Sequence, residues 1–369
     1  MLLDRFLSKV VANMSQYDLR LILSGLAEPV FLLRSNRQIL LTNKAAEELF
    51  GSGLDGRDFV HAIRDPDGLK CVESVLLGEL ISETQVTISI PERVIFRLSA
   101  MYLDVRDEID IRAMVTLHDI SHIQEAEQMR SDFVANVSHE LRSPLTALIG
   151  GIETLKGAAR SDVPAQLRFL DIMDSEAARM NRLVGDLLSL SQVEANERRR
   201  PSELVDILAI AKSVIATLET QARVENKKIG MVCDADFLDV LGDRDELTQV
   251  FHNLIDNAIK YSSEKSQVQI LVSNEVHMHG FNGTVVKIEV NDRGEGISSE
   301  NISRLTERFF RVDDGRSREK GGTGLGLAIV KHVLNRHRGR LAIESQLGVG
   351  STFKVFLPCI NPETNDQSS

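Results

Sequence analysis

Four short motifs in this chain of 369 residues combine side chains that can move a phosphoryl group. In chain order they read SHELRSPLT (138–146), HNLIDNAIKYS (252–262), DRGEGIS (292–298) and GGTGLGLAI (321–329). The first offers an imidazole, which is a nucleophile, and the other three offer amide, carboxylate and glycine-rich segments suited to a nucleoside triphosphate. Their order therefore predicts phosphoryl transfer from a nucleotide to a histidine.

His139 is the predicted nucleophile. At about 100° per residue, the apolar positions between 133 and 155 share a quarter to a third of a helix surface, and His139 falls nearly opposite them. Histidine is neutral and nucleophilic near physiological pH, and Glu140 beside it can orient the ring and take its proton. Ser143, one turn later, can orient a water. An ordinary surface histidine is the alternative, and the surrounding motif argues against it.

The second motif predicts a helix that presents amides to a metal nucleotide complex. Asn253 and Asn257 are four residues apart and share a face. We predict that Asn257 gives an oxygen to Mg²⁺, while Lys260 supplies positive charge and Tyr261 a hydroxyl. The polar side of an ordinary amphipathic helix explains this motif equally well when it is taken alone.

The third motif predicts the end of a strand and a nucleobase contact. Asp292 can accept a hydrogen bond from an exocyclic amine such as that of adenine. Gly294 and Gly296 let the backbone approach a flat ligand closely. An ordinary Asp-Gly turn is the alternative.

The glycine-rich motif directly precedes a predicted helix, so its backbone N–H groups and the helix dipole can receive phosphates. It lacks the Gly-Lys-Ser/Thr of a Walker loop. The preceding segment, 308–322, is rich in arginine and predicts a lid over the nucleotide. The nucleotide-binding candidates in these two segments are Arg311, Gly322, Thr323, Gly324, Leu325 and Gly326.

The elements that position these motifs change in character along the chain. Short strand patterns with two intervening helices run from 28 to 121, and two long helical patterns cover 122–159 and 165–195. Beyond 201, helical patterns at 207–225, 245–261 and 325–338 alternate with strand patterns at 267–273, 284–291, 340–345 and 351–357. Two long helices joined by a short turn expose an apolar stripe, which predicts a homodimer with a four-helix bundle.

Composition narrows the function further. A net charge of −11 argues against direct nucleic-acid binding, and three scattered cysteines fit a reducing compartment. Because no apolar run is long enough to span a bilayer, we expect a cytoplasmic protein. The first 17 residues predict a helix that packs on protein, with peripheral membrane contact as the alternative.

Together the motifs at His139, Asn257, Asp292, Phe309–Phe310 and Gly322–Gly326 resemble the H, N, G1, F and G2 boxes of two-component sensor histidine kinases. The segment from 150 to 194 looks like that of phosphate-regulon sensor kinases. The part before residue 122 resembles a PAS sensor domain, including a last strand that ends in Asp119, Ile120 and Ser121. The resemblance implies ATP and Mg²⁺ as cofactors and the receiver domain of a response regulator as partner. A PAS ligand or an upstream regulatory protein would supply the signal.

The resemblance implies a multidomain α+β fold: a PAS-like antiparallel sheet, an antiparallel helical hairpin, and an α/β-sandwich ATP-binding domain of the GHKL type. The predicted boundaries are an N-terminal helix (1–17), the sensor domain (18–121), the phosphotransfer hairpin (122–198), the catalytic domain (202–360) and a flexible tail (361–369).

One departure from the histidine kinase family and one difference from the related ATPases bear on the chemistry. Ser143 stands where a threonine is usual, and its hydroxyl preserves the predicted phosphatase role. Asn253 stands where related gyrase-like and chaperone ATPases carry a water-activating glutamate, which favours kinase over ATPase. A dimeric scaffold that binds nucleotide without transfer, or a GHKL-type ATPase, is the alternative function.

Overall fold

The computed structural model describes residues 16–89, 93–105, 110–197, 199–236, 238–276, 278–281, 283–313 and 322–360. The chain divides into two compact units, with the boundary between Val134 and Ala135. The helix predicted for 1–17 lies outside the described residues except at its last two positions, and the predicted tail lies entirely outside them.

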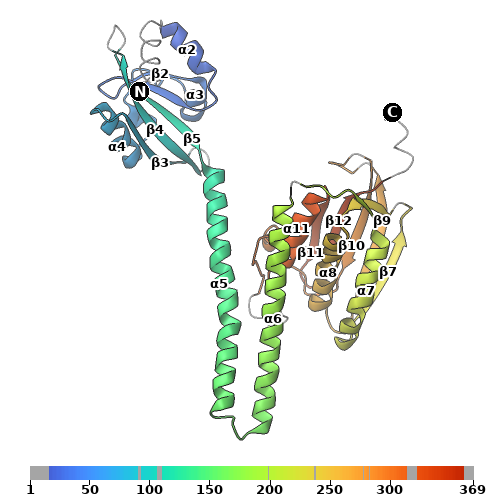
Figure 1. The fold of residues 1–369 in the computed structure, drawn as a ribbon. Helices are drawn as coiled ribbons and strands as arrows, with labels where there is room; N and C mark the ends of the chain where they lie inside the picture. Colours follow the sequence, from blue (N-terminus) through green and yellow to red (C-terminus); the bar gives the residue numbers. More distant parts are fainter. Residues whose placement is uncertain are drawn as a thin grey trace. The chain divides into compact units, whose positions relative to one another are not determined.

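A five-stranded antiparallel sheet with the strand order β2-β1-β5-β4-β3 forms the first unit (Figure 1). Its strands are β1 (Val30–Leu33), β2 (Ile39–Thr42), β3 (Ile81–Ser89), β4 (Arg93–Val105) and β5 (Ile111–Asp119). The helices beside it are α2 (Gln16–Ser24), α3 (Lys44–Phe50) and α4 (Pro66–Leu76), with a 3₁₀ turn at Phe59–His61. This arrangement confirms the predicted antiparallel sheet.

Asn43 connects three parts of this unit. Its side-chain oxygen caps α3 by accepting from Ala46 N at 3.0 Å, and it also accepts from Val30 N at 2.9 Å. Its side-chain nitrogen donates to the carbonyl of Glu28 at 2.7 Å. Because Asn43 is buried, these hydrogen bonds compensate for its lost hydration and fix α3 against the start of β1.

The last strand passes directly into a long helix, as the sequence predicts. Asp119 ends β5, and its carboxylate accepts from Ser121 N at 2.8 Å, where α5 (Ser121–Lys156) begins. The hydroxyl of Ser121 accepts from Ile95 N in β4 at 3.0 Å. The start of the helix is therefore held by the sheet.

The helical hairpin consists of α5 and α6 (Val163–Ala195). Asp162 caps α6 by accepting from Ala165 N, and Pro164 lies in its first turn. Gly151 of α5 lies so close to α6 that an added Cβ atom would come within 2.9 Å of Met173. Pro144 lies inside α5, which continues for three more turns after it.

The rest of the second unit is a layer of helices on one sheet, as predicted (Figure 1). The sheet has the order β11-β12-β10-β9-β7, and only the β7–β9 pair is parallel. Its strands are β7 (Lys228–Asp234), β9 (Gln267–Val276), β10 (Thr284–Asn291), β11 (Arg340–Gln346) and β12 (Gly350–Pro358). The helices are α7 (Ile207–Val224), α8 (Arg244–Tyr261), α9 (Ser299–Ile302) and α11 (Gly326–Arg336), and β6 (Glu203–Asp206) pairs with β8 (Asp239–Gly242).

His337 joins the start of α8 to the end of α11. Its Nε2 accepts from Asp243 N at 2.9 Å, and its Nδ1 lies 2.8 Å from the carbonyl of Val333. This pattern requires the neutral ring protonated on Nδ1. Burial lowers the pKa of the His337 imidazole, in agreement with a neutral structural role.

We expect this histidine to make stability depend on pH. In the unfolded chain, histidine titrates near about 6.5. The contribution of neutral His337 to the free energy of unfolding is therefore fully present above about pH 6.5. As the pH falls below it, the unfolded chain binds a proton that the folded chain resists, so the free energy of unfolding decreases by at most about 1.4 kcal/mol per pH unit.

Urea unfolding followed by circular dichroism at pH 5.5 and 7.5 tests this in the wild type and in His337→Phe. The variant leaves Asp243 N–H without its partner, at a cost of about 1–3 kcal/mol. The stability advantage of the wild type should be smaller at pH 5.5. An equal advantage at both pH values would contradict the expectation.

Candidate nucleotide and phosphoacceptor site

Helix α8 carries four of the predicted nucleotide-binding side chains. Its buried face packs on the sheet and the neighbouring helices through Leu247, Val250, Phe251, Leu254, Ile255, Ala258 and Ile259. Asp243 caps its start by accepting from Asp245 N and Glu246 N. This packing leaves the side of α8 with Asn253 and Asn257 partly accessible.

Asn253 links α8 to the start of α11. Its side-chain nitrogen donates to the carbonyl of Gly326 at 3.1 Å, and its oxygen accepts from Gln249 at 3.1 Å. In the described part of the chain, the Asn257 amide one turn later has no hydrogen-bond partner. Asn253 therefore positions the glycine-rich loop, while the oxygen of Asn257 remains available to a ligand.

Lys260 and Tyr261 end the same helix. The ammonium group of Lys260 pairs with Asp256 at 2.6 Å, and both side chains are largely buried. Tyr261 is partly exposed, and the residue after it, Ser262, forms an isolated β-bridge with Gly294. The structure thus brings the end of the second motif against the third motif.

Asp292 directly follows β10, as predicted, and its carboxylate is buried. Its Oδ1 accepts from Gly294 N at 2.9 Å and from Ser351 N at 3.2 Å. Burial raises the pKa of the Asp292 carboxyl, while these two hydrogen bonds act in the opposite direction. These hydrogen bonds hold the side chain in place, and its buried carboxylate can accept a hydrogen bond from a neutral N–H donor.

Gly294 and Gly296 are required by the protein backbone itself. A Cβ atom at Gly294 would lie 2.3 Å from the carbonyl oxygen of Tyr261, and one at Gly296 would lie 2.0 Å from that of Gln346. Gly296 also has a φ of +68°. The sequence predicts close approach to a ligand, and the structure shows close approach to neighbouring strands and helices.

The glycine-rich loop lies at the N-terminus of α11. Gly324 has a φ of +74°, and an added Cβ atom would lie 2.8 Å from Cα of Phe309. Phe309 N donates to the carbonyl of Gly324 at 2.8 Å, and Arg311 Nη2 donates to that of Gly322 at 2.8 Å. The hydroxyl of Thr323 accepts from Leu325 N at 3.3 Å. Gly321 and most of the predicted lid lie outside the described residues.

The phosphoacceptor motif meets this loop through Glu140. Its Oε2 accepts from Arg179 Nη2 of α6 at 2.6 Å and from Arg311 Nη2 at 3.0 Å. All three side chains are at least 87% buried, since their exposed fractions are 13%, 10% and 5%. The sequence predicts Glu140 as the partner of His139, but the structure shows its carboxylate between two guanidinium groups.

His139 is exposed on α5, as its place opposite the apolar stripe predicts. Ser143 is exposed one turn later. Within the residues that the structure describes, no hydrogen bond or ion pair joins either side chain to the nucleotide-binding candidates. The imidazole is therefore accessible to a reactant from outside its own helix.

Sequence reasoning missed three residues that shape this site. Arg179 and Asp186 lie on α6, and Asp186 Oδ2 accepts from the hydroxyl of Thr323 at 2.6 Å. Ser351 donates to Asp292 from β12. At about 100° per residue, Arg179 and Asp186 fall beside Leu183 and Leu190 on one face of α6, which is a signal that the sequence contains. Ser351 gives no signal in the sequence, because its contact with Asp292 depends on the pairing of β12 with β10.

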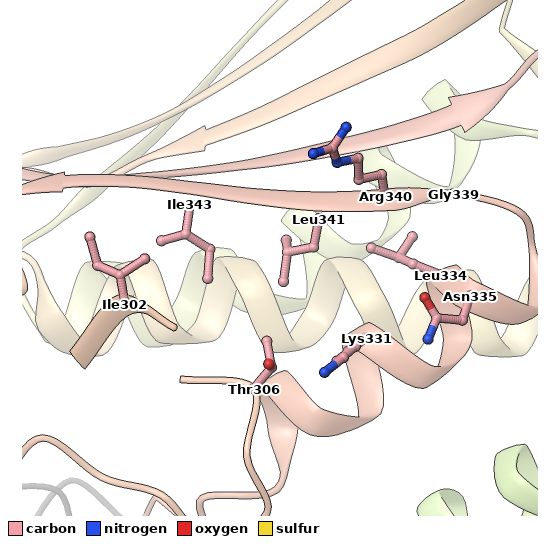
Figure 2. A pocket seen from close by; sticks show the side chains of 9 residues that line it. All are labelled: Ile302, Thr306, Lys331, Leu334, Asn335, Gly339, Arg340, Leu341 and Ile343. Carbon is pink, nitrogen blue, oxygen red and sulfur yellow. The ribbon is translucent and has the colours of Figure 1, made fainter. Parts of the chain in front are cut away.

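A separate pocket of about 300 Å³ lies between α9, α11 and β11 (Figure 2). Leu341 and Ile343 project into it from β11, and Lys331 and Thr306 lie across from them. None of the predicted site residues lines it. This pocket is thus distinct from the nucleotide-binding candidates.

The chain matches two protein families. Residues 129–196 match the "His Kinase A (phospho-acceptor) domain", and residues 242–361 match the "Histidine kinase-, DNA gyrase B-, and HSP90-like ATPase" family. The phosphate regulon sensor protein PhoR of Pseudomonas aeruginosa is 35% identical over 334 residues, which are 89% of this chain and 72% of that protein. The chain belongs to the sensor histidine kinase family.

The sensor protein kinase WalK of Staphylococcus saprophyticus is similar over a smaller share of its length: it is 37% identical over 253 residues, which are 69% of this chain and 40% of WalK. Among solved structures, that of the Acinetobacter baumannii histidine kinase AdeS is 28% identical with a TM-score of 0.45. It covers 60% of this chain and 98% of the chain in that structure.

Family membership makes this chain an ATP-binding protein histidine kinase, as the motifs predict. The resemblance to phosphate-regulon sensor kinases is likewise confirmed by the similarity to PhoR. Among the described residues, no helix combines the length and apolar character needed to cross a membrane.

The two glycines at positions 296 and 348 provide a matched test of the Asp292 loop. Both have positive φ angles, of +68° and +79°, but only at Gly296 would a Cβ atom meet the backbone. Alanine at either position costs about 1 kcal/mol in backbone strain. Gly296→Ala must also displace the loop.

We therefore expect Gly296→Ala to weaken ATP binding by about tenfold or more, since the loss of one well-formed contact costs about 1.4 kcal/mol or more. Gly348→Ala should bind ATP like the wild type. Isothermal titration calorimetry measures both affinities, and thermal melting measures the strain. Equal losses of affinity in the two variants would contradict this account of the loop.

Proposed function

We propose that this histidine kinase transfers the γ-phosphoryl group of ATP to His139. The observation that carries the proposal is the ion pair between Arg311 and Glu140, which joins the predicted lid to the residue next to the exposed imidazole. A P–N bond forms on a ring nitrogen of His139, the bond from Pγ to the bridging oxygen of ADP breaks, and the imidazole releases a proton.

Glu140 is the proposed acceptor of that proton. Its carboxylate is held by Arg179 and Arg311 in this structure, so the oxygen Oε2 is already occupied by two guanidinium donors. Arg179 belongs to the same hairpin as Glu140, whereas Arg311 belongs to the lid. Proton transfer therefore requires that Arg311 leave Glu140, and its proposed destination is the triphosphate.

The proposed nucleotide site joins the remaining sequence candidates. Asp292 would accept from adenine, and the loop of Gly322, Gly324 and Gly326 would receive phosphate oxygens at the start of α11. Lys260 would add positive charge near the phosphates. These roles follow from the buried acceptor and from the backbone N–H groups at the helix start.

Asn257 fits a magnesium ion. Mg²⁺ prefers oxygen ligands and often takes only one or two from the protein, with phosphate oxygens and water supplying the others. In the described residues the Asn257 amide has no other partner, and it lies one turn from Asn253, which contacts the glycine-rich loop. When bound, the ion would neutralise charge on the phosphates.

Hydrolysis of ATP is the competing reaction, and Asn253 argues against it. An amide cannot take a proton from water, and its two ends are already used by Gln249 and Gly326. The γ-phosphate would therefore persist until the imidazole reaches it. This favours the kinase over a gyrase-like or chaperone ATPase.

The hairpin offers a surface for a second copy. Large apolar side chains are exposed along both helices: Leu145, Ile149, Leu167, Leu170, Val184 and Leu188. Because exposed apolar surface on this scale is costly in water, we propose a homodimer in which two hairpins form a four-helix bundle.

The phosphoryl group would then pass to an aspartate of a response-regulator receiver domain. Ser143, exposed one turn from His139, would assist the reverse reaction by orienting water toward the phosphorylated regulator. The similarity to PhoR supports a role in a phosphate regulon. The PAS-like sheet is the proposed input, through a ligand or an upstream protein.

Replacement of the nucleophile tests the central proposal. His139→Gln should abolish incorporation of label from γ-labelled ATP, because glutamine offers no nucleophilic nitrogen, while ATP affinity stays unchanged. His122→Gln is a matched control, since His122 lies exposed on the same helix. Labelling that persists in His139→Gln, or is lost in His122→Gln, would refute the assignment.

The metal role of Asn257 has a separate test. Asn257→Asp places a negative charge beside the phosphates, and we expect about tenfold weaker ATP binding. Calorimetric titration with ATP and Mg²⁺ measures the loss. Asn335→Asp adds the same charge to the outer side of α11 and should leave affinity unchanged. An affinity of Asn257→Asp equal to that of this control would argue against the role.

A further inference from the structure

Helix α6 has a docking face that meets α11, the first residue of the predicted lid and the glycine-rich loop after the lid. At about 100° per residue, its members fall within an arc of about 100°. They are Leu183, Asp186, Leu190, Val193 and Glu194. Glu194 pairs with Arg308 at 2.6 Å, and Figure 1 shows α11 beside α6. Asp186 is the member that touches the glycine-rich loop.

The contact between Asp186 and Thr323 occupies an atom that a nucleotide would use. The Thr323 hydroxyl donates to Asp186 Oδ2 at 2.6 Å and accepts from Leu325 N at 3.3 Å. A hydroxyl has one proton to donate. While Asp186 holds that proton, Thr323 cannot donate it to a phosphate oxygen.

Charge adds to this competition. Loss of hydration on burial raises the pKa of the Asp186 carboxyl, while the hydrogen bond from Thr323 and the nearby Lys260, Arg182 and His252 act in the opposite direction. A triphosphate at the same loop would bring further negative charge into this environment. Like charges repel more strongly where water is excluded.

We propose that Asp186 sets the ATP affinity of this kinase by occupying the phosphate-facing hydroxyl of Thr323 whenever the docking face of α6 lies against the loop. ATP then binds by displacing Asp186. The inference rests on the proposed function in one respect, because it takes the glycine-rich loop to be the phosphate site.

The competition is reciprocal. If docking of α6 lowers the affinity for ATP by a given factor, bound ATP must lower the equilibrium constant for docking by the same factor. Because Arg311 also donates to the carbonyl of Gly322, movement of the loop would allow Arg311 to leave Glu140 beside His139. The nucleotide thus both supplies the phosphoryl group and releases the proposed base.

The test compares ATP affinities of full-length chains that carry His139→Gln, so that phosphotransfer cannot interfere. Asp186→Asn keeps the shape of the side chain and removes its charge, and Asp186→Ala removes the acceptor as well. Both should bind ATP at least about fivefold more tightly, the lower end of typical coupling between sites. Asp171→Asn is the matched control, because Asp171 is an exposed carboxylate on the same helix.

Equal or weaker ATP binding by the two Asp186 variants, relative to Asp171→Asn, would overturn the inference. A measurement on the unaltered chain guards against misfolded variants. Arg336 donates to the carbonyl of Arg199 at 2.7 Å in the docked state, so saturating ATP should speed tryptic cleavage after Arg199. Unchanged or slower cleavage would also overturn it.

These outcomes separate the inference from the proposed function. If His139 becomes labelled but the Asp186 variants bind like the control, only the inference fails. If the Asp186 variants gain affinity while His139 is never labelled, the transfer proposal fails and the role of Asp186 stands.

Discussion

The hydrogen bond from Asn253 to the carbonyl of Gly326 is the interaction on which the site depends. It ties the helix that carries Asn257 to the start of α11, where backbone N–H groups point toward any phosphate. The contacts of His337 and Arg336 with the first turn of α8 hold the other end of α11. The chemical consequence of Asn253 is equally important, because an amide in this position cannot activate water. One side chain thus links the two helices and, in the proposed function, favours transfer over hydrolysis.

The segment that contains the predicted lid is fastened at both ends by polar contacts that can be broken. Arg311 holds Glu140 near the start of the lid, and Thr323 holds Asp186 directly after its end. Buried ion pairs add little net stability, because desolvation offsets much of their attraction, but they fix one geometry among several. Such contacts suit a docked state that must open during each catalytic cycle. A purely apolar contact would have no comparable sensitivity to an incoming charged ligand.

Most of the architecture could be predicted because its elements are regular. The strands of the first unit, both hairpin helices and α7, α8 and α11 follow patterns of period 2 or 3.6. The strand β7 was missed because its sequence, KIGMVCD, lacks clear alternation, and its parallel partner β9 lies more than 30 residues away. The short pair β6 and β8 was missed for the same reason. Pairing at long range leaves no local signal.

In the candidate site, too, local motifs could be predicted and long-range partners could not. Motif spacing predicted Asn253, Asp292 and the glycine-rich loop, but Glu140 was assigned to His139 because adjacency was the only information available. Its actual partners, Arg179 and Arg311, come from 39 and 171 residues away. For Gly294 and Gly296 the sequence could indicate crowding, but not that the crowding atoms belong to the protein. The sequence indicates which residue types are present, but not which distant residues they contact in the fold.

Helix α6 explains how one hairpin can serve several purposes. Its apolar residues recur as one broad stripe in the sequence, yet the structure divides them. Leu183, Leu190 and Val193 are buried on the docking face, whereas Leu170, Val184 and Leu188 are exposed on nearly the opposite side, at about 100° per residue. A second hairpin can therefore cover the exposed side while α11 docks and undocks on the other. Because the two faces do not overlap, dimer formation need not change when ATP displaces Asp186.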